Sequence, residues 1–94
     1  MINEIGLIGY GNFGKFISFH LSKYFKVFVY DFVLNSNDTT LENISFSSLE
    51  NVVNKDILIL SLPVQYLEEC LIKIKDIIKK DCLVLDVCSV KLNL

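Results

Sequence analysis

The 94-residue sequence contains no arginine, and all nine of its basic residues are lysines. It therefore lacks the planar guanidinium group that grips a carboxylate or phosphate at two points. Eleven acidic residues bring the formal net charge to −2. We expect no nucleic-acid partner, because neutralising a phosphate backbone requires a basic face.

Long apolar runs are also missing. None reaches the roughly 18 residues that a membrane-spanning helix needs, so we expect no membrane partner. No basic residue precedes the first apolar stretch, which argues against a secretory signal and favours a cytoplasmic location. The hydrophobic fraction of 52% nevertheless excludes a disordered chain.

Cysteine and histidine are scarce and scattered. Cys70, Cys82 and Cys88 are odd in number, form no CxxC pair and have no histidine near them in the sequence. We expect free thiols that act as small core residues, with no disulfide framework and no metal site. The single histidine, His20, falls inside a predicted helix, where we interpret it as a partly packed structural residue.

Short apolar runs alternate with stripes of helical spacing. The predicted strands cover residues 5–8, 26–30, 44–46, 57–62 and 82–87. The predicted helices are an apolar stripe over 13–24, a short helix over 48–53 and a longer helix over 63–80. Ser47 and Glu50 have the spacing of a capping box for the short helix, and Pro63 suits the first position of the long one. Residues 34–43 are polar and predict a loop.

This alternation predicts an α/β fold, because strands separated by helices pair in parallel through right-handed crossovers. We expect a Rossmann-like, doubly wound sheet of about five strands. No linker or shift in composition divides the chain, so residues 1–94 are interpreted as one dinucleotide-binding domain. We expect the sheet to be incomplete at its C-terminal end.

Three of the four glycines form the pattern Gly9-x-Gly11-x-x-Gly14, directly after the first predicted strand. In a strand–turn–helix context this pattern indicates dinucleotide binding. Gly9 would permit the tight turn, Gly11 would let a diphosphate approach the backbone, and Gly14 would allow close helix packing. The amide groups near Asn12 and Phe13 would then face the anion. The alternative is a plain glycine-rich turn.

An acidic residue, Asp31, ends the second predicted strand. At this distance from the glycines, a carboxylate accepts hydrogen bonds from the adenosine ribose hydroxyls. It would repel the 2′-phosphate of NADP, and no arginine stands beside it. We therefore predict NAD as the cofactor, with NADP less favoured. The alternative is a solvated acid at the start of a loop.

Two further segments follow predicted strands and should reach the same edge of the sheet. Ser61, Leu62 and Pro63 would contact the cofactor with apolar side chains and backbone groups. Ser89 would hydrogen-bond a substrate hydroxyl, and Lys91 would supply positive charge. The alternative for this pair is a helix-capping serine followed by a surface lysine.

Residues 5–14, 61–64 and 86–91 together resemble the prephenate/arogenate dehydrogenases of tyrosine biosynthesis. The element Asp-Val-x-Ser-Val-Lys at 86–91 is the most specific, although Cys88 replaces a glycine common in the family. The resemblance implies oxidative decarboxylation with hydride transfer to nicotinamide, and it places Ser89 near the substrate hydroxyl. It covers only the N-terminal nucleotide-binding part of such an enzyme.

In that family the catalytic histidine, the substrate-gripping basic residues and the homodimer-forming helical domain lie beyond the position of Leu94. The resemblance therefore implies a chain that binds NAD weakly and is inactive by itself toward its small-molecule substrate. Three other functions are compatible with the sequence. They are another dehydrogenase or reductase of the same type, a non-catalytic NAD-binding module that regulates a partner, and a gene remnant that binds no nucleotide.

Overall fold

The computed structural model of the chain describes residues 3–32 and 42–87. The elements in order are β1 (Glu4–Ile8), α1 (Asn12–Leu21), β2 (Lys26–Tyr30), β3 (Ile44–Phe46), α2 (Leu49–Val52), β4 (Ile57–Leu60), α3 (Val64–Ile74) and β5 (Leu83–Asp86). Every predicted strand is present, at most two residues away from its predicted bounds. Most of the predicted polar loop over 34–43 lies outside the described residues.

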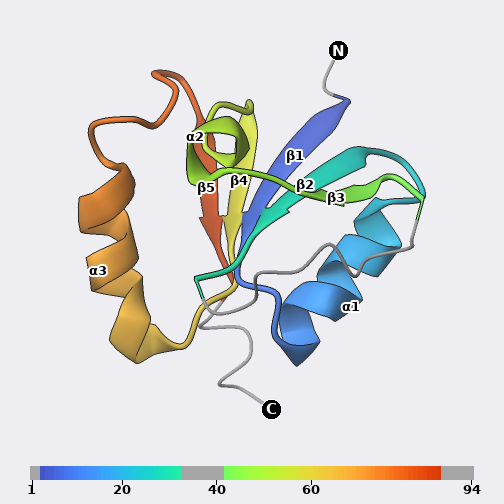
Figure 1. Ribbon diagram of the computed structural model, residues 1–94, viewed down its shortest axis with the longest axis horizontal. Coiled ribbons are helices and arrows are strands. Elements are labelled where there is room, and N and C mark those ends of the chain that lie inside the picture. The colour runs from blue at the N-terminus through green and yellow to red at the C-terminus, as the bar shows by residue number, and fades with distance from the viewer. Residues whose placement is uncertain (1–2, 33–41, 88–94) are drawn as a thin grey trace.

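The five strands form one parallel sheet in the order β3-β2-β1-β4-β5. From β1 the chain moves first to one side, through β2 and β3, and then returns to build β4 and β5 on the other side (Figure 1). The direction of winding thus reverses between β1 and β4. This confirms the predicted doubly wound, Rossmann-like α/β fold.

Helices cover both faces of the sheet, with α1 on one face and α2 and α3 on the other (Figure 1). Each face has its own core. Leu7 and Val29 belong to the cluster against which the α1 residues Ile17 and Leu21 pack. The second cluster lies under α2 and α3 and combines Ile8, Val52, Val53, Leu58, Leu60, Leu62, Cys70 and Ile74. Because each face of the sheet contacts a core, its central strands must be apolar on both faces, and β1 and β4 have this character.

The burial of α1 differs from the predicted apolar stripe. The residues it buries fully are Gly14 and Ser18, whereas Phe16 is 59% exposed. At Gly14 the helix lies so close to the turn before it that a Cβ would be 2.1 Å from the Gly9 carbonyl oxygen, and the rings of Phe16 and Phe19 face outward. His20 is also exposed and packs against the rings of Phe16 and Phe19 on the surface.

The long helix is shorter than predicted. Pro63 is its N-cap rather than its first residue, because its backbone is extended with ψ of 146°. The helix ends at Ile74, and turns follow it. Lys79 lies beyond the helix, donates its backbone N–H to Val53 at 3.2 Å and forms an ion pair with Asp56. These contacts hold the segment against the end of α2 and the start of β4 in place of another helical turn.

The cap of α2 is also one residue away from the predicted position. Ser48, rather than Ser47, is the N-cap, and its hydroxyl accepts the backbone N–H of Asn51 at 3.2 Å. Ser47 accepts instead from the side-chain amide of Asn51 at 2.7 Å. The spacing to Glu50 favoured Ser47, but the adjacent Ser48 offers the same hydroxyl and makes the capping bond.

Candidate functional site

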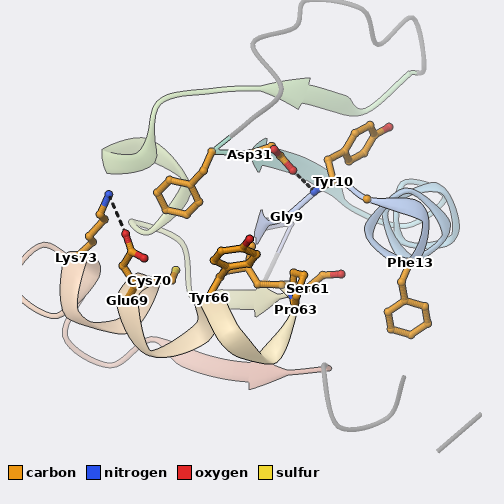
Figure 2. Close-up of a pocket in the computed structure, with 13 residues that line it drawn as sticks. Gly9, Tyr10, Phe13, Asp31, Ser61, Pro63, Tyr66, Glu69, Cys70 and Lys73 are labelled. Atoms are coloured by element: carbon orange, nitrogen blue, oxygen red, sulfur yellow. Dashed lines mark hydrogen bonds and ion pairs between the residues drawn. The ribbon is translucent and has the colours of Figure 1, made fainter. Parts of the chain in front are cut away.

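A cleft of about 660 Å³ opens where β1, β2 and β4 end, at the point where the winding of the sheet reverses (Figure 2). In open α/β sheets this is the position where ligands bind. The cleft is lined by Gly9, Tyr10, Gly11, Phe13, Asp31, Phe32, Ser61, Leu62, Pro63, Tyr66, Glu69, Cys70 and Lys73. Seven of the predicted cofactor-binding residues are among them. The other two, Asn12 and Gly14, lie beside the cleft in the first turn of α1.

Gly9 makes the turn that leaves β1. Its φ is +102°, a conformation that residues with a side chain rarely adopt. A Cβ here would also lie 2.2 Å from the carbonyl oxygen of Ser61. The backbone N–H of Gly9 donates to Tyr30 at 2.8 Å, so the turn is tied to the end of β2. Only glycine fits this position.

The other two glycines of the motif have different surroundings. A Cβ on Gly14 would lie 2.1 Å from the carbonyl oxygen of Gly9, so α1 and the turn are in close contact. A Cβ on Gly11 would meet nothing within 4 Å, and Gly11 lines the cleft. The absent side chain of Gly11 thus leaves room for a ligand against the backbone.

The N-terminus of α1 begins at this open position. Gly11 is the N-cap and offers no side chain to the helix. The first intrahelical hydrogen bond runs from the Lys15 N–H to the Gly11 carbonyl at 2.9 Å. The amides of Asn12 and Phe13 precede that bond and have no acceptor within the helix. Together with the helix dipole they suit an anion such as a diphosphate.

Asp31 connects the end of β2 to the glycine turn. Its Oδ2 accepts the backbone N–H of Tyr10 at 2.7 Å, as Figure 2 shows. The side chain is half-buried and lines the cleft, so it is not a freely solvated loop acid. Two segments that are 21 residues apart in the sequence thereby fix one carboxylate at the wall of the cleft.

The segment after β4 forms the opposite wall. The Ser61 N–H donates to the Ile8 carbonyl at 2.8 Å, which continues the sheet one residue past β4. Leu62 is buried in the core below, whereas Pro63 is exposed beside the cleft. All three residues line the cleft, where the sequence predicted a contact with the cofactor.

Six lining residues were not predicted: Tyr10, Phe32, Tyr66, Glu69, Cys70 and Lys73. Four of them lie on α3 with spacings of three and four, which places them on one face of a helix. That spacing is visible in the sequence, but the sequence does not indicate that this face meets the end of β2. Burial raises the pKa of the Cys70 thiol above its usual range.

Several predicted features lie elsewhere. Ser89, Lys91 and Cys88 fall outside the described residues, so the structure leaves their predicted roles open. His20 does not line the cleft. Within 3–32 and 42–87 no group of three histidine, cysteine, aspartate or glutamate side chains is arranged to hold a metal. No described helix is long and apolar enough to cross a membrane.

Among solved structures, the chain is similar to an NAD-complexed D-isomer specific 2-hydroxyacid dehydrogenase from Lactobacillus delbrueckii ssp. bulgaricus. The TM-score is 0.70 and the sequence identity is 25%. The similarity covers 89% of this chain but only 26% of the dehydrogenase, so the chain spans about a quarter of that protein. No curated protein matches the chain.

The family comparison is independent of the glycine motif. Residues 33–94 match the prephenate dehydrogenase, nucleotide-binding domain family. This region begins just after Asp31 and includes β3, β4, α3 and β5. The glycine turn and Asp31 precede it and have the Rossmann geometry described above. With a match over more than half of its length, the chain belongs to the family of prephenate dehydrogenase nucleotide-binding domains.

Proposed function

We propose that the chain is the dinucleotide-binding domain of an NAD-dependent prephenate or arogenate dehydrogenase of tyrosine biosynthesis. Membership of the family and the likeness to an NAD-complexed dehydrogenase support an oxidoreductase domain that binds nicotinamide. The bound cofactor would accept hydride from the substrate carbon that bears the hydroxyl group. The residues of this chain bind and orient that cofactor.

The residues present fit a dinucleotide. The open space at Gly11 and the amides of Asn12 and Phe13 suit the diphosphate. Asp31 suits the adenosine ribose, because an ionised carboxylate only accepts hydrogen bonds and the ribose hydroxyls donate them. Ser61, Leu62 and Pro63 suit the nicotinamide half on the opposite wall.

The observation that carries the proposal is the Asp31 carboxylate held at the glycine turn by the Tyr10 N–H. It also favours NAD over NADP, because a fixed carboxylate repels a 2′-phosphate. Lys73 is the only cationic side chain among the described residues of the cleft wall, and it is paired with Glu69. The sequence contains no arginine to offset the charge of Asp31.

Calorimetric titration of the 94-residue chain with NAD and NADP tests this proposal. We expect binding that is stronger for NAD. Asp31→Ser should weaken NAD binding about 10- to 100-fold, the value of hydrogen bonds to a charged group, and should narrow the preference over NADP. Asp31→Asn is the matched control, since it removes the charge but keeps an oxygen to accept the Tyr10 N–H. If both variants discriminate between NAD and NADP as the unaltered chain does, the role of Asp31 is refuted. If the unaltered chain gives no heat of binding with NAD, the whole proposal is refuted.

The described residues do not supply complete catalytic machinery. No histidine lines the cleft in the part of the chain that the structure describes. We therefore expect this chain alone to form no NADH from prephenate, as followed by absorbance at 340 nm. Ser89 and Lys91 are proposed to contact the substrate hydroxyl and to supply positive charge in the complete enzyme, which we propose to be a cytoplasmic homodimer.

A second candidate is a dehydrogenase acting on another hydroxy acid. The likeness to the 2-hydroxyacid dehydrogenase favours it, since that structure shares this fold over most of the chain. A longer protein that joins this domain to a catalytic domain distinguishes the candidates. NADH formation with prephenate or arogenate supports the first, and formation only with 2-hydroxy acids supports the second.

A further inference from the structure

One end of the cleft has no role in the proposal above. We call it the aromatic end and define it by Phe32, Tyr66, Glu69, Cys70 and Lys73. Phe32 follows directly after Asp31, and the other four residues lie on α3. The aromatic end therefore combines two segments that face each other across the cleft. Cys70 is buried at its base, and the other four side chains are exposed.

Phe32 is held by two contacts although its side chain is 40% exposed. The ring of Tyr30 meets it edge-to-face, with centroids 5.0 Å apart and an interplanar angle of 87°. The Nζ atom of Lys73 lies 5.1 Å from the centroid of the Phe32 ring. Both distances are typical of favourable aromatic and cation–π contacts. The ring is thus partly fixed before any ligand arrives.

Lys73 joins the two walls of the aromatic end. It projects from the last turn of α3 toward the ring that follows β2. Glu69, one helical turn earlier, lies 4.0 Å from the Lys73 ammonium group, and Figure 2 shows the two side chains together near the end of the cleft. The Lys73 ammonium group thus lies within contact distance of both the Glu69 carboxylate and the Phe32 ring.

The chemistry of the aromatic end indicates what it binds. Phe32 and Tyr66 offer exposed aromatic surface, which stacks on planar heterocycles. The neighbouring Asp31 is the residue assigned to the adenosine ribose, and the base attached to that ribose is a flat purine. Phe32 directly follows Asp31 in the sequence. Its ring is therefore the exposed aromatic surface closest along the chain to a ribose bound at Asp31.

We propose that Phe32 contacts the adenine base by stacking, and that Lys73 is a positioning residue that fixes the Phe32 ring through the cation–π contact. This inference rests on the proposed function, since it requires a dinucleotide in the cleft. It assigns to Lys73 a role that depends on Phe32 and not on direct contact with a phosphate.

Titrations of Phe32→Leu, Lys73→Met, Lys73→Arg and the double variant with NAD test the proposal. ADP-ribose, which has the adenine end without nicotinamide, and nicotinamide mononucleotide, which lacks adenine, complete the ligand set. Phe19 on α1 and Lys23 in the turn after it provide a matched control pair, because the Lys23 Nζ atom lies 5.3 Å from the Phe19 ring centroid and neither residue lines the cleft. Urea unfolding of each variant shows whether the fold is intact.

We expect Phe32→Leu to weaken NAD and ADP-ribose binding about 5- to 100-fold, the range for loss of one stacked base. Lys73→Met should weaken the binding of both ligands about 2- to 5-fold. Lys73→Arg should bind them as well as the unaltered chain does, since arginine also makes cation–π contacts. In the Phe32→Leu background, Lys73→Met should have no further effect. Phe19→Leu, Lys23→Met and all titrations with nicotinamide mononucleotide should show no change.

Different failures have different meanings. If the unaltered chain binds neither NAD nor ADP-ribose, the proposed function fails and this inference with it. If it binds both but Phe32→Leu binds as well as Phe19→Leu, only the stacking role is overturned. If Lys73→Met weakens binding equally with and without Phe32, or weakens NADP more than NAD, Lys73 contacts the ligand directly and the positioning role is overturned.

Discussion

The two ends of the cleft are built in opposite ways. At the glycine end, formed by Gly9, Gly11 and Gly14, backbone atoms contact backbone atoms, and two of the three positions have no room for a single added carbon. At the aromatic end, long and mostly exposed side chains from α3 meet the ring that follows β2. The first geometry is fixed by the fold itself, whereas the second is fixed by contacts that a side chain can lose.

This difference separates stability from affinity. Substitutions at Gly9 and Gly14 should alter the folded state, because the turn and α1 cannot be displaced from each other. Substitutions of exposed residues at the aromatic end should leave folding almost unchanged, since exposed positions rarely contribute more than about 0.5 kcal/mol. They should act on ligand binding instead.

The largest effect is expected for Gly9→Ala. The new methyl group combines a positive φ with an approach of 2.2 Å to the Ser61 carbonyl oxygen. We expect a loss of roughly 3 kcal/mol or more from the free energy of unfolding, a large fraction of a small domain's stability. Urea denaturation followed by circular dichroism measures it. A variant with an unchanged midpoint would show that the glycine end is as adaptable as the aromatic end.

Gly11→Ala should sharpen the comparison, because Gly11 belongs to the same motif but has open space around it. The free energy of unfolding should fall by about 1 kcal/mol or less, the cost of alanine at an N-cap. NAD binding should weaken about 5- to 100-fold, since the methyl group occupies space that the ligand needs. Calorimetry and urea denaturation of the same sample compare the two losses. A variant that loses stability and keeps its affinity contradicts the assignment.

Cys70 tests whether the aromatic end has a rigid base beneath its exposed walls. Its side chain is 2% exposed and burial raises its pKa, whereas Cys82 is half-buried with a pKa also raised by burial. We expect iodoacetamide at pH 8 to label Cys70 about tenfold or more slowly than Cys82. Peptide mass spectrometry over time measures both rates. Saturating NAD should slow the labelling of Cys70 further and leave Cys82 unchanged. Equal rates for the two thiols would mean that this base opens readily.

The smallest effect is expected far from the cleft, at the exposed ion pair of Asp56 and Lys79. The hydrogen bond and the charge of Lys79 lower the pKa of Asp56 below 3.8, and Asp56 raises the pKa of Lys79 above 10.5. The stability that the pair contributes is present between these pH values. It is lost as the pH falls through the lowered pKa of Asp56, or rises through the raised pKa of Lys79.

Asp56→Asn should therefore lower Tm slightly at neutral pH, and the difference from the unaltered chain should vanish at both extremes. Thermal melts across the pH range, with Glu50→Gln as a control on the exposed surface of α2, measure this dependence. NAD binding should be unchanged, because neither residue lines the cleft. A Tm difference that persists at low pH would show that the carboxylate acts in some way other than through its charge.

The predictability of each end follows from the same contrast. The sequence indicated the glycine end because Gly-x-Gly-x-x-Gly between a strand and a helix is a local pattern with a local steric cause. Asp31 was predicted as a ligand-binding acid. Its hydrogen bond to Tyr10 was not, because a contact across 21 residues has no local signal.

The aromatic end depends on such distant contacts throughout. In the sequence, Lys73 follows Glu69 by four residues, which is the spacing of an ion pair on a helix, and that contact is present at 4.0 Å. Its second contact, with Phe32, requires knowing that α3 runs past the end of β2. The outward-facing Phe16 differs from the predicted apolar stripe over 13–24 for a related reason. Hydrophobicity favoured burial, but the close approach of α1 at Gly14 allows only small residues at the contact.

The β5 strand has a practical consequence for handling this chain. Leu83, Val84 and Leu85 are all exposed, and among the strands of residues 3–32 and 42–87 β5 is an outermost one. An apolar rim with backbone groups available on its outer side is a template on which other extended chains can dock. Dilute samples suit all the titrations above, and Val84→Lys would blunt the rim without changing a residue that lines the cleft.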